Sequence, residues 1–293
     1  MGEEKFTLIL LFFGIIFFIS LLQAKKVKKK EGYFLAERNL SYLYIFFTVL
    51  STSIGSSSTI LLFNLISKYG FGGVFLEIGG AFGLIILGLF FSKKLRGTNC
   101  FSLPQILGLK YGKRVRIFSS FFVIIAEILW LSLIFKALQT IGSFNPALFY
   151  FLILSFILSI SLGGQWAIAK TDVFYSFLIF FSFLLTYFFG NLKLEGFINF
   201  ERMDQGLLLS LFFSTFLPHL AGSDIWSKVL SSKDEREAKT GLIFAGLGKF
   251  FWGFLIFLII KKFSFPNNGD DTLLNFIFSF PKIFSFLLIL GLL

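Results

Sequence analysis

Nine residues inside a long apolar block decide the fold: Ser51-Thr52-Ser53-Ile54-Gly55-Ser56-Ser57-Ser58-Thr59. All of them except Ile54 and Gly55 carry a hydroxyl group. Glycine weakens a helix by roughly 1 kcal/mol relative to alanine, and hydroxyl groups can satisfy backbone groups that an interrupted helix frees. Two interpretations are open. The block is either an intact helix whose small residues allow close packing, or a broken membrane helix whose free carbonyls bind a cation.

The composition places this stretch in a membrane protein. The chain has 293 residues, 56% of them hydrophobic, and a mean hydropathy of +0.85, whereas soluble domains contain about 45–50% apolar residues. Apolar blocks of about 17–27 residues recur, long enough to cross roughly 30 Å of hydrocarbon. We therefore predict an all-α, polytopic membrane protein. Its nine expected helices lie at residues 6–22, 40–66, 71–91, 115–141, 147–162, 173–189, 207–220, 242–260 and in a last block that ends at residue 293.

The basic residues divide unevenly between the loops on the two sides. With the N-terminus outside, 18 of the 27 Lys and Arg residues fall in cytoplasmic segments and 7 fall outside, as the positive-inside rule for short loops requires. The net charge of +11 is thus explained by topology and does not indicate nucleic acid as a partner. We predict a multi-pass protein of the cell membrane with its N-terminus outside and the loop around Cys100 inside.

The residue types give no support to enzymatic chemistry. A single histidine, His219, and a single cysteine, Cys100, provide no spacing for a zinc site or a cysteine–histidine nucleophile pair. The sequence also lacks a phosphate-binding glycine motif and the acidic clusters that a lipid-metabolising membrane enzyme would need. We expect no enzyme activity, no cofactor and no metal other than a transported cation.

Two carboxylates fall within predicted membrane helices. Glu77 lies in the helix at 71–91, and Glu127 lies in the helix at 115–141. An ionisable group within a membrane span is costly and is a functional candidate by default. The alternative for Glu77 is an outer carboxylate that water reaches, and the alternative for Glu127 is a structural pair with Lys136.

The seventh predicted helix carries a second break signal. His219 follows Pro218, which removes a backbone donor, and Gly222 and Asp224 come soon after. Interrupted helices in corresponding positions of two units are a sequence pointer to a transport site. For His219 itself, a packing role with satisfied hydrogen bonds is the alternative.

The stretch Gly32-Tyr33-Phe34-Leu35-Ala36-Glu37-Arg38-Asn39-Leu40 resembles the solute:sodium symporter family, which includes sodium/glucose, proline, pantothenate and sialic acid transporters. Family members carry glycine at the position of Glu37. The resemblance covers about residues 32–245. Its further pieces are Tyr69-Gly70, Leu103-Pro104-Gln105, Tyr111-Gly112, Gly163-Gly164, Ala169-Lys170-Thr171-Asp172 and residues 230–238.

The resemblance implies a LeuT-like inverted-repeat bundle. An extra helix at residues 1–24 would precede a first five-helix repeat at 40–190 and a partial second repeat, of about three helices, at 205–293. Because five is odd, the second unit must begin on the face opposite to the first, and the predicted helix count satisfies this requirement. Pro281 interrupts the last apolar block, so we expect either a short final segment or one kinked helix, and an incomplete second repeat.

The implied function is sodium-coupled symport of a small polar solute by alternating access. By position, the backbone carbonyls of Ser51 and Ile54 resemble sodium ligands, Ser58 and Glu77 resemble solute contacts, and Asp172 resembles an acid of the inward ion-release pathway. The expected partners are Na+, the solute and membrane lipids.

The family's remaining sodium ligands are hydroxyls of the ninth helix, which the sequence does not reach. We therefore expect these 293 residues alone to behave as a fragment without transport activity. A symporter-like membrane sensor module that does not transport is the alternative function.

Overall fold

A computed structural model shows the chain as a helical bundle and describes residues 3–24, 27, 29–142, 146–190, 200–263 and 272–292. Over these residues the sole β-type pairing is a bridge between Leu40 and Ser232. The elements are α1 (Glu3–Ala24), α2 (Lys30–Leu35), η1 (Ala36–Arg38), α3 (Tyr42–Ser53), α4 (Ser56–Tyr69), η2 (Gly70–Val74), α5 (Phe75–Ile86), η3 (Leu87–Phe91), α6 (Ser92–Arg96), α7 (Leu103–Tyr111), α8 (Lys113–Gly142), α9 (Pro146–Phe189), α10 (Gln205–Ala221), α11 (Ser223–Ser231), α12 (Glu235–Phe263), α13 (Thr272–Phe278) and α14 (Lys282–Leu292).

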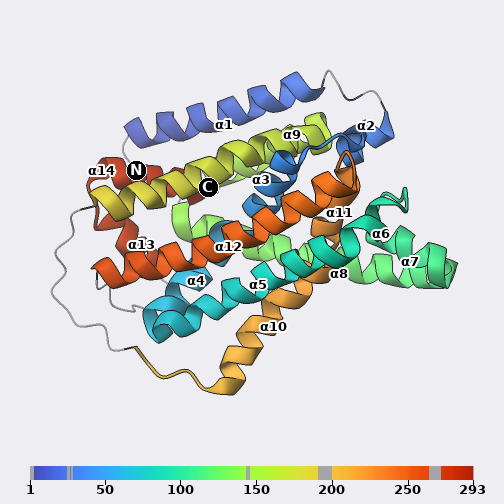
Figure 1. The fold of residues 1–293 in the computed structure, drawn as a ribbon. Coiled ribbons are helices and arrows are strands. Elements are labelled where there is room, and N and C mark those ends of the chain that lie inside the picture. The colour runs from blue at the N-terminus through green and yellow to red at the C-terminus, as the bar shows by residue number, and fades with distance from the viewer. Residues whose placement is uncertain are drawn as a thin grey trace.

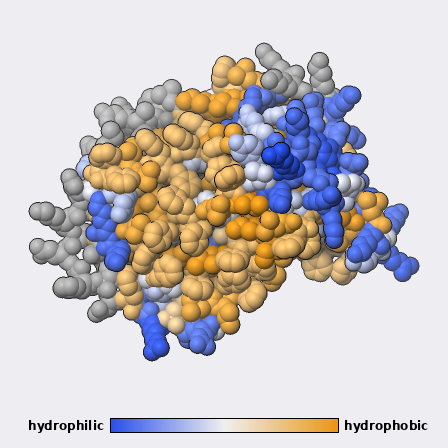
Figure 2. All heavy atoms as spheres, viewed as in Figure 1, coloured by the Kyte–Doolittle hydropathy of each residue, from blue (hydrophilic) through white to orange (hydrophobic). Residues whose placement is uncertain are grey.

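The bundle has two polar ends and an apolar middle. In Figure 1, α2, α6, α7 and α11 gather at the right-hand end, whereas α13 and α14 lie at the left. Figure 2 shows an apolar band across the middle and hydrophilic residues concentrated at the right-hand end. This distribution is that of a protein whose middle contacts lipid hydrocarbon and whose ends reach water.

Five helices of the described part are long and apolar enough to cross a membrane, fewer than the nine helices expected. Interruptions account for part of the difference, because a broken helix is divided into short elements. The long spans are Ser56–Arg96, Lys113–Ala137, Ile153–Phe189, Gln205–Ser231 and Glu235–Phe263, and the shorter apolar helices are Phe12–Ala24 and Tyr42–Ser53.

The helix expected at residues 40–66 is broken, as the hydroxyl-rich stretch predicted. α3 ends at Ser53 and α4 begins at Ser56, with Gly55 in an extended conformation (φ −60°, ψ 174°) between them. The start of the helix was predicted wrongly, because Leu40 forms the bridge to Ser232 and α3 begins only at Tyr42.

The second break signal is confirmed, but its position differs. Pro218 lies inside α10, and the interruption falls at Gly222 (φ −64°, ψ 137°), between α10 and α11. The carbonyl oxygen of Pro218 accepts a hydrogen bond from the backbone N–H of Gly222 at 2.7 Å. Proline near the end of a helix thus leaves the helix intact until glycine redirects the chain.

The loop expected between residues 162 and 173 is replaced by a sharp break at Gly164 (φ +55°, ψ −152°), where the two helices that make up α9 meet. A Cβ atom at this position would lie 2.6 Å from the carbonyl oxygen of Tyr33, so both the backbone conformation and the close approach require glycine. The last apolar block, in contrast, forms two short helices, α13 and α14, instead of one kinked helix.

Two arginines and a short backbone pairing join the segments at the basic end. Arg38 donates hydrogen bonds to the carbonyl oxygens of Asn99 (2.8 Å) and Cys100 (3.0 Å), and Arg96 donates to the carbonyl oxygen of Ser232 (2.7 Å). The backbone N–H of Leu40 donates to the Ser231 carbonyl at 3.1 Å. We call this group of contacts the arginine clamp. It ties the segment before α3 to the loops after α6 and α11.

Lys228 is one of the 18 basic residues that the topology prediction assigns to cytoplasmic segments. In the structure it lies in α11 and its side chain is buried, with 7% of its surface exposed. It therefore belongs to the interior of the bundle.

Glu37 occupies a backbone conformation that suits glycine. Its φ is +55° and its ψ is 22°, in the left-handed region that costs an L-residue roughly 1–2 kcal/mol. Ala36 and Arg38 also have positive φ. This positive φ gives a steric reason for the glycine that members of the symporter family carry at the position of Glu37.

Replacing Glu37 with glycine should stabilise the protein. The relief of left-handed strain exceeds the added entropy of the unfolded chain, for a net gain of about 0.5–1 kcal/mol. Tm in detergent, from near-UV circular dichroism, is the measurement. Glu37→Ala is the control, since it removes the carboxylate but keeps the strain. Equal Tm shifts for the two variants would contradict the backbone explanation.

The predicted topology needs a designed probe, because Cys100 is buried, with 1% of its surface exposed. In a Cys100→Ser background, Lys94→Cys and Arg202→Cys place thiols at exposed positions on opposite sides of the predicted membrane. An impermeant thiol reagent should label Arg202→Cys in intact cells and Lys94→Cys only after permeabilisation. The reverse pattern would invert the orientation.

Candidate functional site

The break between α3 and α4 frees backbone carbonyls inside the bundle. The Ser58 hydroxyl lies within hydrogen-bonding distance of the carbonyl oxygens of Ser53 (3.1 Å) and Gly55 (2.9 Å), and the Thr59 hydroxyl donates to that of Ile54 (3.0 Å). An unsatisfied backbone group in a membrane costs several kcal/mol. The hydroxyl-rich sequence therefore supplies the hydrogen-bond donors that satisfy the carbonyls at this break.

A lysine from α12 also reaches the broken segment. The Nζ atom of Lys249 donates a hydrogen bond to the Ser53 carbonyl oxygen at 3.2 Å and lies 2.6 Å from Oε2 of Glu77 in α5. Lys249 and Glu77 each have only 1% of their surface exposed. A fully buried ion pair is weak evidence for stability, because desolvation offsets the attraction, whereas ionisable groups inside a membrane span usually serve function.

Two glycines allow α5 and α12 to approach closely enough for this pair. A Cβ at Gly80 would lie 2.2 Å from Cε of Lys249, and a Cβ at Gly253 would lie 2.8 Å from Cβ of Glu77. Each charged residue thus faces a glycine of the opposite helix. Any larger residue at these positions would displace the helix or the ion pair.

His219 links the two broken helices. Its Nδ1 atom lies 2.8 Å from the carbonyl oxygen of Thr215, to which it donates, and its Nε2 atom lies 3.2 Å from Oγ of Ser53. The Nδ1–H group therefore has an acceptor, as the packing alternative requires, whereas Nε2 shares the single hydroxyl hydrogen of Ser53 with the carbonyl oxygen of Val49, which lies 2.7 Å from Oγ. Its partner is nevertheless the last residue of α3, so the ring belongs to the polar cluster around the break.

Asp172 lies on another side of α3. The Thr48 hydroxyl donates to its carboxylate, and the side chains of Ser51 and Lys228 lie nearby. The structure thus brings together Ser51 and Asp172, which are 121 positions apart in the numbering.

Glu127 contacts the second break. Its Oε1 atom accepts a hydrogen bond from the Ser223 hydroxyl at 3.0 Å, and Ser223 is the first residue of α11. The pair expected with Lys136 is therefore not the interaction that the structure shows for this carboxylate.

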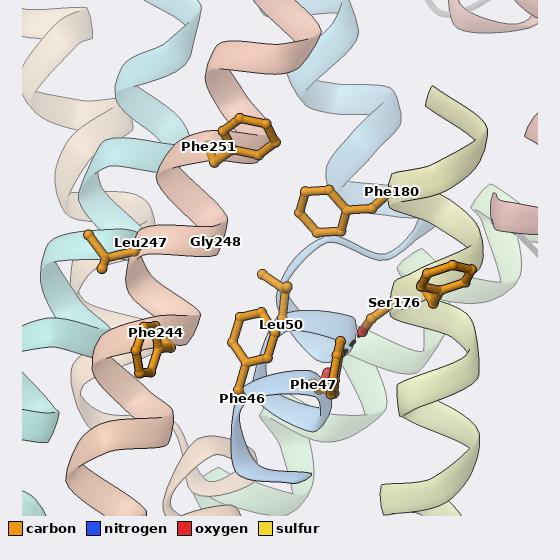
Figure 3. A pocket seen from close by; sticks show the side chains of 10 residues that line it. Phe46, Phe47, Leu50, Ser176, Phe180, Phe244, Leu247, Gly248 and Phe251 are labelled. Carbon is orange, nitrogen blue, oxygen red and sulfur yellow. Dashed lines mark hydrogen bonds between the residues drawn. The ribbon is translucent and has the colours of Figure 1, made fainter. Parts of the chain in front are cut away.

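An apolar groove of about 400 Å³ lies between α3, α9 and α12 (Figure 3). Its only polar side chain, Ser176, donates to the carbonyl oxygen of Phe47 at 3.0 Å. The groove therefore offers nothing that would recognise a polar solute. Its lining residues are Phe46, Phe47, Leu50, Ser176, Phe177, Phe180, Phe244, Leu247, Gly248 and Phe251.

The predicted site residues fall into two groups around the end of α3. Ser51 and Asp172 lie close together on one side. On the other side, Ser58 contacts the Ser53 carbonyl directly, and Glu77 is linked to the same carbonyl through Lys249. Among the described residues, no hydrogen bond or ion pair joins the two groups.

Sequence reasoning missed Lys249, Thr48 and Ser53. A signal for Lys249 existed: it is a lysine in the middle of an apolar helix, next to Gly248 and near Gly253. Thr48 has no such signal, because its role depends on α9 lying beside α3.

Comparison with known proteins relates this arrangement to a family and to solved structures. The family model of the sodium:solute symporter family matches residues 33–221. A solved Na+-coupled sialic acid symporter, in a substrate-bound outward-open state described as revealing a novel Na+ site, superposes with a TM-score of 0.79 at 18% identity. The superposition covers 99% of this chain and 69% of that one. A search of curated protein sequences found no match. The family match spans more than half of the chain. The chain therefore belongs to the sodium:solute symporter family, whose members couple solute transport to Na+.

Proposed function

We propose that this multi-pass membrane protein moves a small polar solute together with Na+ by alternating access, with the ion and the solute held on different sides of α3. The observation that carries this proposal is the buried Lys249–Glu77 pair, which contacts the carbonyl of Ser53 at a helix break. Such a pair costs desolvation energy. A solute that hydrogen-bonds to both charged groups would give this unfavourable burial of charge a function.

The ion is proposed to bind at the side of α3 that faces α9. The carbonyl oxygens of Ser51 and Ile54 would be ligands, because Ile54 is outside the helix and Ser51 lies in its last turn. The Ile54 carbonyl accepts from Thr59 and retains a second lone pair. Asp172 lies next to Ser51 and would attract the cation and receive it on the way inward.

The solute is proposed to bind at the side of α3 that faces α5 and α12. Glu77 offers acceptors and Lys249 offers donors, while the Ser58 hydroxyl already serves the broken backbone and can contribute mainly its oxygen. Sialic acid, named for the similar structure, belongs in a panel of test solutes with a hexose, proline and pantothenate.

Neutralising the ion pair tests the solute side. Glu77→Gln and Lys249→Met each leave one buried charge without its partner, which costs about 3–5 kcal/mol, whereas the double variant leaves none. We expect both single variants to lower Tm strongly, and the double variant to recover most of that loss while the solute no longer raises its Tm in the presence of Na+.

The exposed pair Lys68–Glu201, with a 3.4 Å separation, provides the control. Lys68→Met/Glu201→Gln should change stability by less than about 1 kcal/mol and leave the solute-dependent rise in Tm unchanged. An unmodified solute-dependent rise in Tm in the folded Glu77→Gln/Lys249→Met variant would remove this pair from the solute site.

The ion side is tested by Na+-dependent stabilisation. Bound ligand stabilises the folded state, by about 2.7 kcal/mol at a concentration of about 100 times Kd, so Na+ should raise Tm relative to choline at equal ionic strength. Asp172→Asn should weaken this rise. Ser51→Ala should keep it, because the proposed ligand is a backbone carbonyl. Asp234→Asn, at an exposed loop residue, is the matched control. A rise lost in Ser51→Ala but kept in Asp172→Asn would contradict the assignment.

A further inference from the structure

The corner between α7 and α8 carries four basic side chains that are all exposed: Lys110, Lys113, Arg114 and Arg116. We call these residues the basic corner. The sequence from residue 97 to 126 contains no Asp or Glu, and the described structure pairs none of the four with a carboxylate. Within the described part of the chain, their charge is therefore not compensated by a carboxylate.

Exposed apolar side chains lie among these cations. The exposed fractions are 71% for Leu109, 58% for Tyr111, 61% for Ile117 and 67% for Phe118. Nζ of Lys110 lies 5.2 Å from the centre of the Tyr111 ring. Aromatic and apolar side chains beside basic ones are typical of a segment at the boundary between hydrocarbon and headgroups.

The backbone holds the corner in place. Gly112 makes the turn with a φ of +90°, and the backbone of Gly108 lies against Arg116, where an added Cβ would be 2.8 Å from the Arg116 Cβ. α7 therefore packs on the first turns of α8. In Figure 1 this corner projects at the right-hand end, which Figure 2 shows to be the more hydrophilic end beside the apolar band.

We propose that the basic corner binds the headgroups of anionic phospholipids. Four cations that the protein leaves unpaired, next to side chains able to enter the acyl region, match a negatively charged group attached to hydrocarbon. A soluble polyanion would use the cations but not the apolar side chains. This site is distinct from the proposed ion and solute sites and does not depend on which solute is carried.

A second basic group at the same end offers a comparison within the chain. Lys233, Arg236 and Lys239 are exposed but alternate with Asp234, Glu235 and Glu237. Glu235 also lies 3.8 Å from Lys93. Because nearby carboxylates cancel much of its field, this second group should bind anionic lipid less well than the basic corner.

Native mass spectrometry of the purified chain in detergent with equimolar phosphatidylglycerol and phosphatidylcholine is the test. A cation near an anionic surface is worth about 1 kcal/mol, or about fivefold in binding. We expect at least about a tenfold preference for phosphatidylglycerol. Lys110→Gln/Lys113→Gln/Arg114→Gln/Arg116→Gln should lose most of it, and Lys94→Gln/Lys233→Gln/Arg236→Gln/Lys239→Gln, which removes the same charge, should keep it.

The smaller variant Lys113→Gln/Arg114→Gln keeps the test decisive if the fourfold variant does not fold, and it should lose part of the preference. Raising NaCl from about 0.05 to about 0.5 M should weaken phosphatidylglycerol binding by the unmodified chain and leave phosphatidylcholine binding unchanged. Three results would overturn the proposal: an unchanged preference in the corner variants, an equal loss in the Lys94 to Lys239 variant, or displacement of phosphatidylglycerol by inorganic phosphate.

Discussion

The rest of the structure depends on one constraint, which is that the backbone carbonyls freed at Ser53 and Ile54 must be satisfied without bulk water. A helix normally meets this requirement by itself. Here side chains meet it instead, through the hydroxyls of Ser58 and Thr59 and the ammonium of Lys249. Because each of these bonds fixes a geometry, the break is a rigid polar point in an apolar bundle. The polar contacts from α5, α9, α10 and α12 all converge near it.

The lysine that serves this break creates a second requirement. An ammonium group buried to 1% exposure needs a counter-charge, which Glu77 supplies at 2.6 Å. The pair in turn needs glycine at positions 80 and 253, because a Cβ at either would overlap the opposite helix. The break between α3 and α4 thus requires small residues in α5 and α12, the two helices that carry the ion pair. The apolar groove on the other face of α12 shows the contrast, since Gly248 there lies among phenylalanines.

The basic end combines a tightly joined part with a free part. In the arginine clamp, Arg38 and Arg96 donate to backbone carbonyls of loops far apart in sequence, and three successive residues with positive φ position Arg38. The clamp therefore holds together segments that are far apart in the sequence. The basic corner takes no part in it, and its charges remain available to the surroundings of the protein.

The sequence by itself determined the class of the protein and the place of one helix break. Apolar blocks set the membrane class because hydrocarbon thickness fixes their length, and glycine with clustered hydroxyls marked the interruption near Gly55 because such residues can satisfy the backbone groups that it frees. The sequence also identified Glu77 as a candidate, since a carboxylate within an apolar span is costly unless it has a partner or a function. Only the tertiary structure decided the partners. Lys249, 172 positions after Glu77 in the numbering, meets it because α12 packs on α5, and Thr48 meets Asp172 because α9 lies beside α3. That residues 165–172 are helical directly after the break at Gly164 was likewise invisible, because polar residues in that stretch look like a loop until neighbouring helices bury them. Local patterns report what one segment needs, whereas pairings between distant segments depend on how all the helices pack.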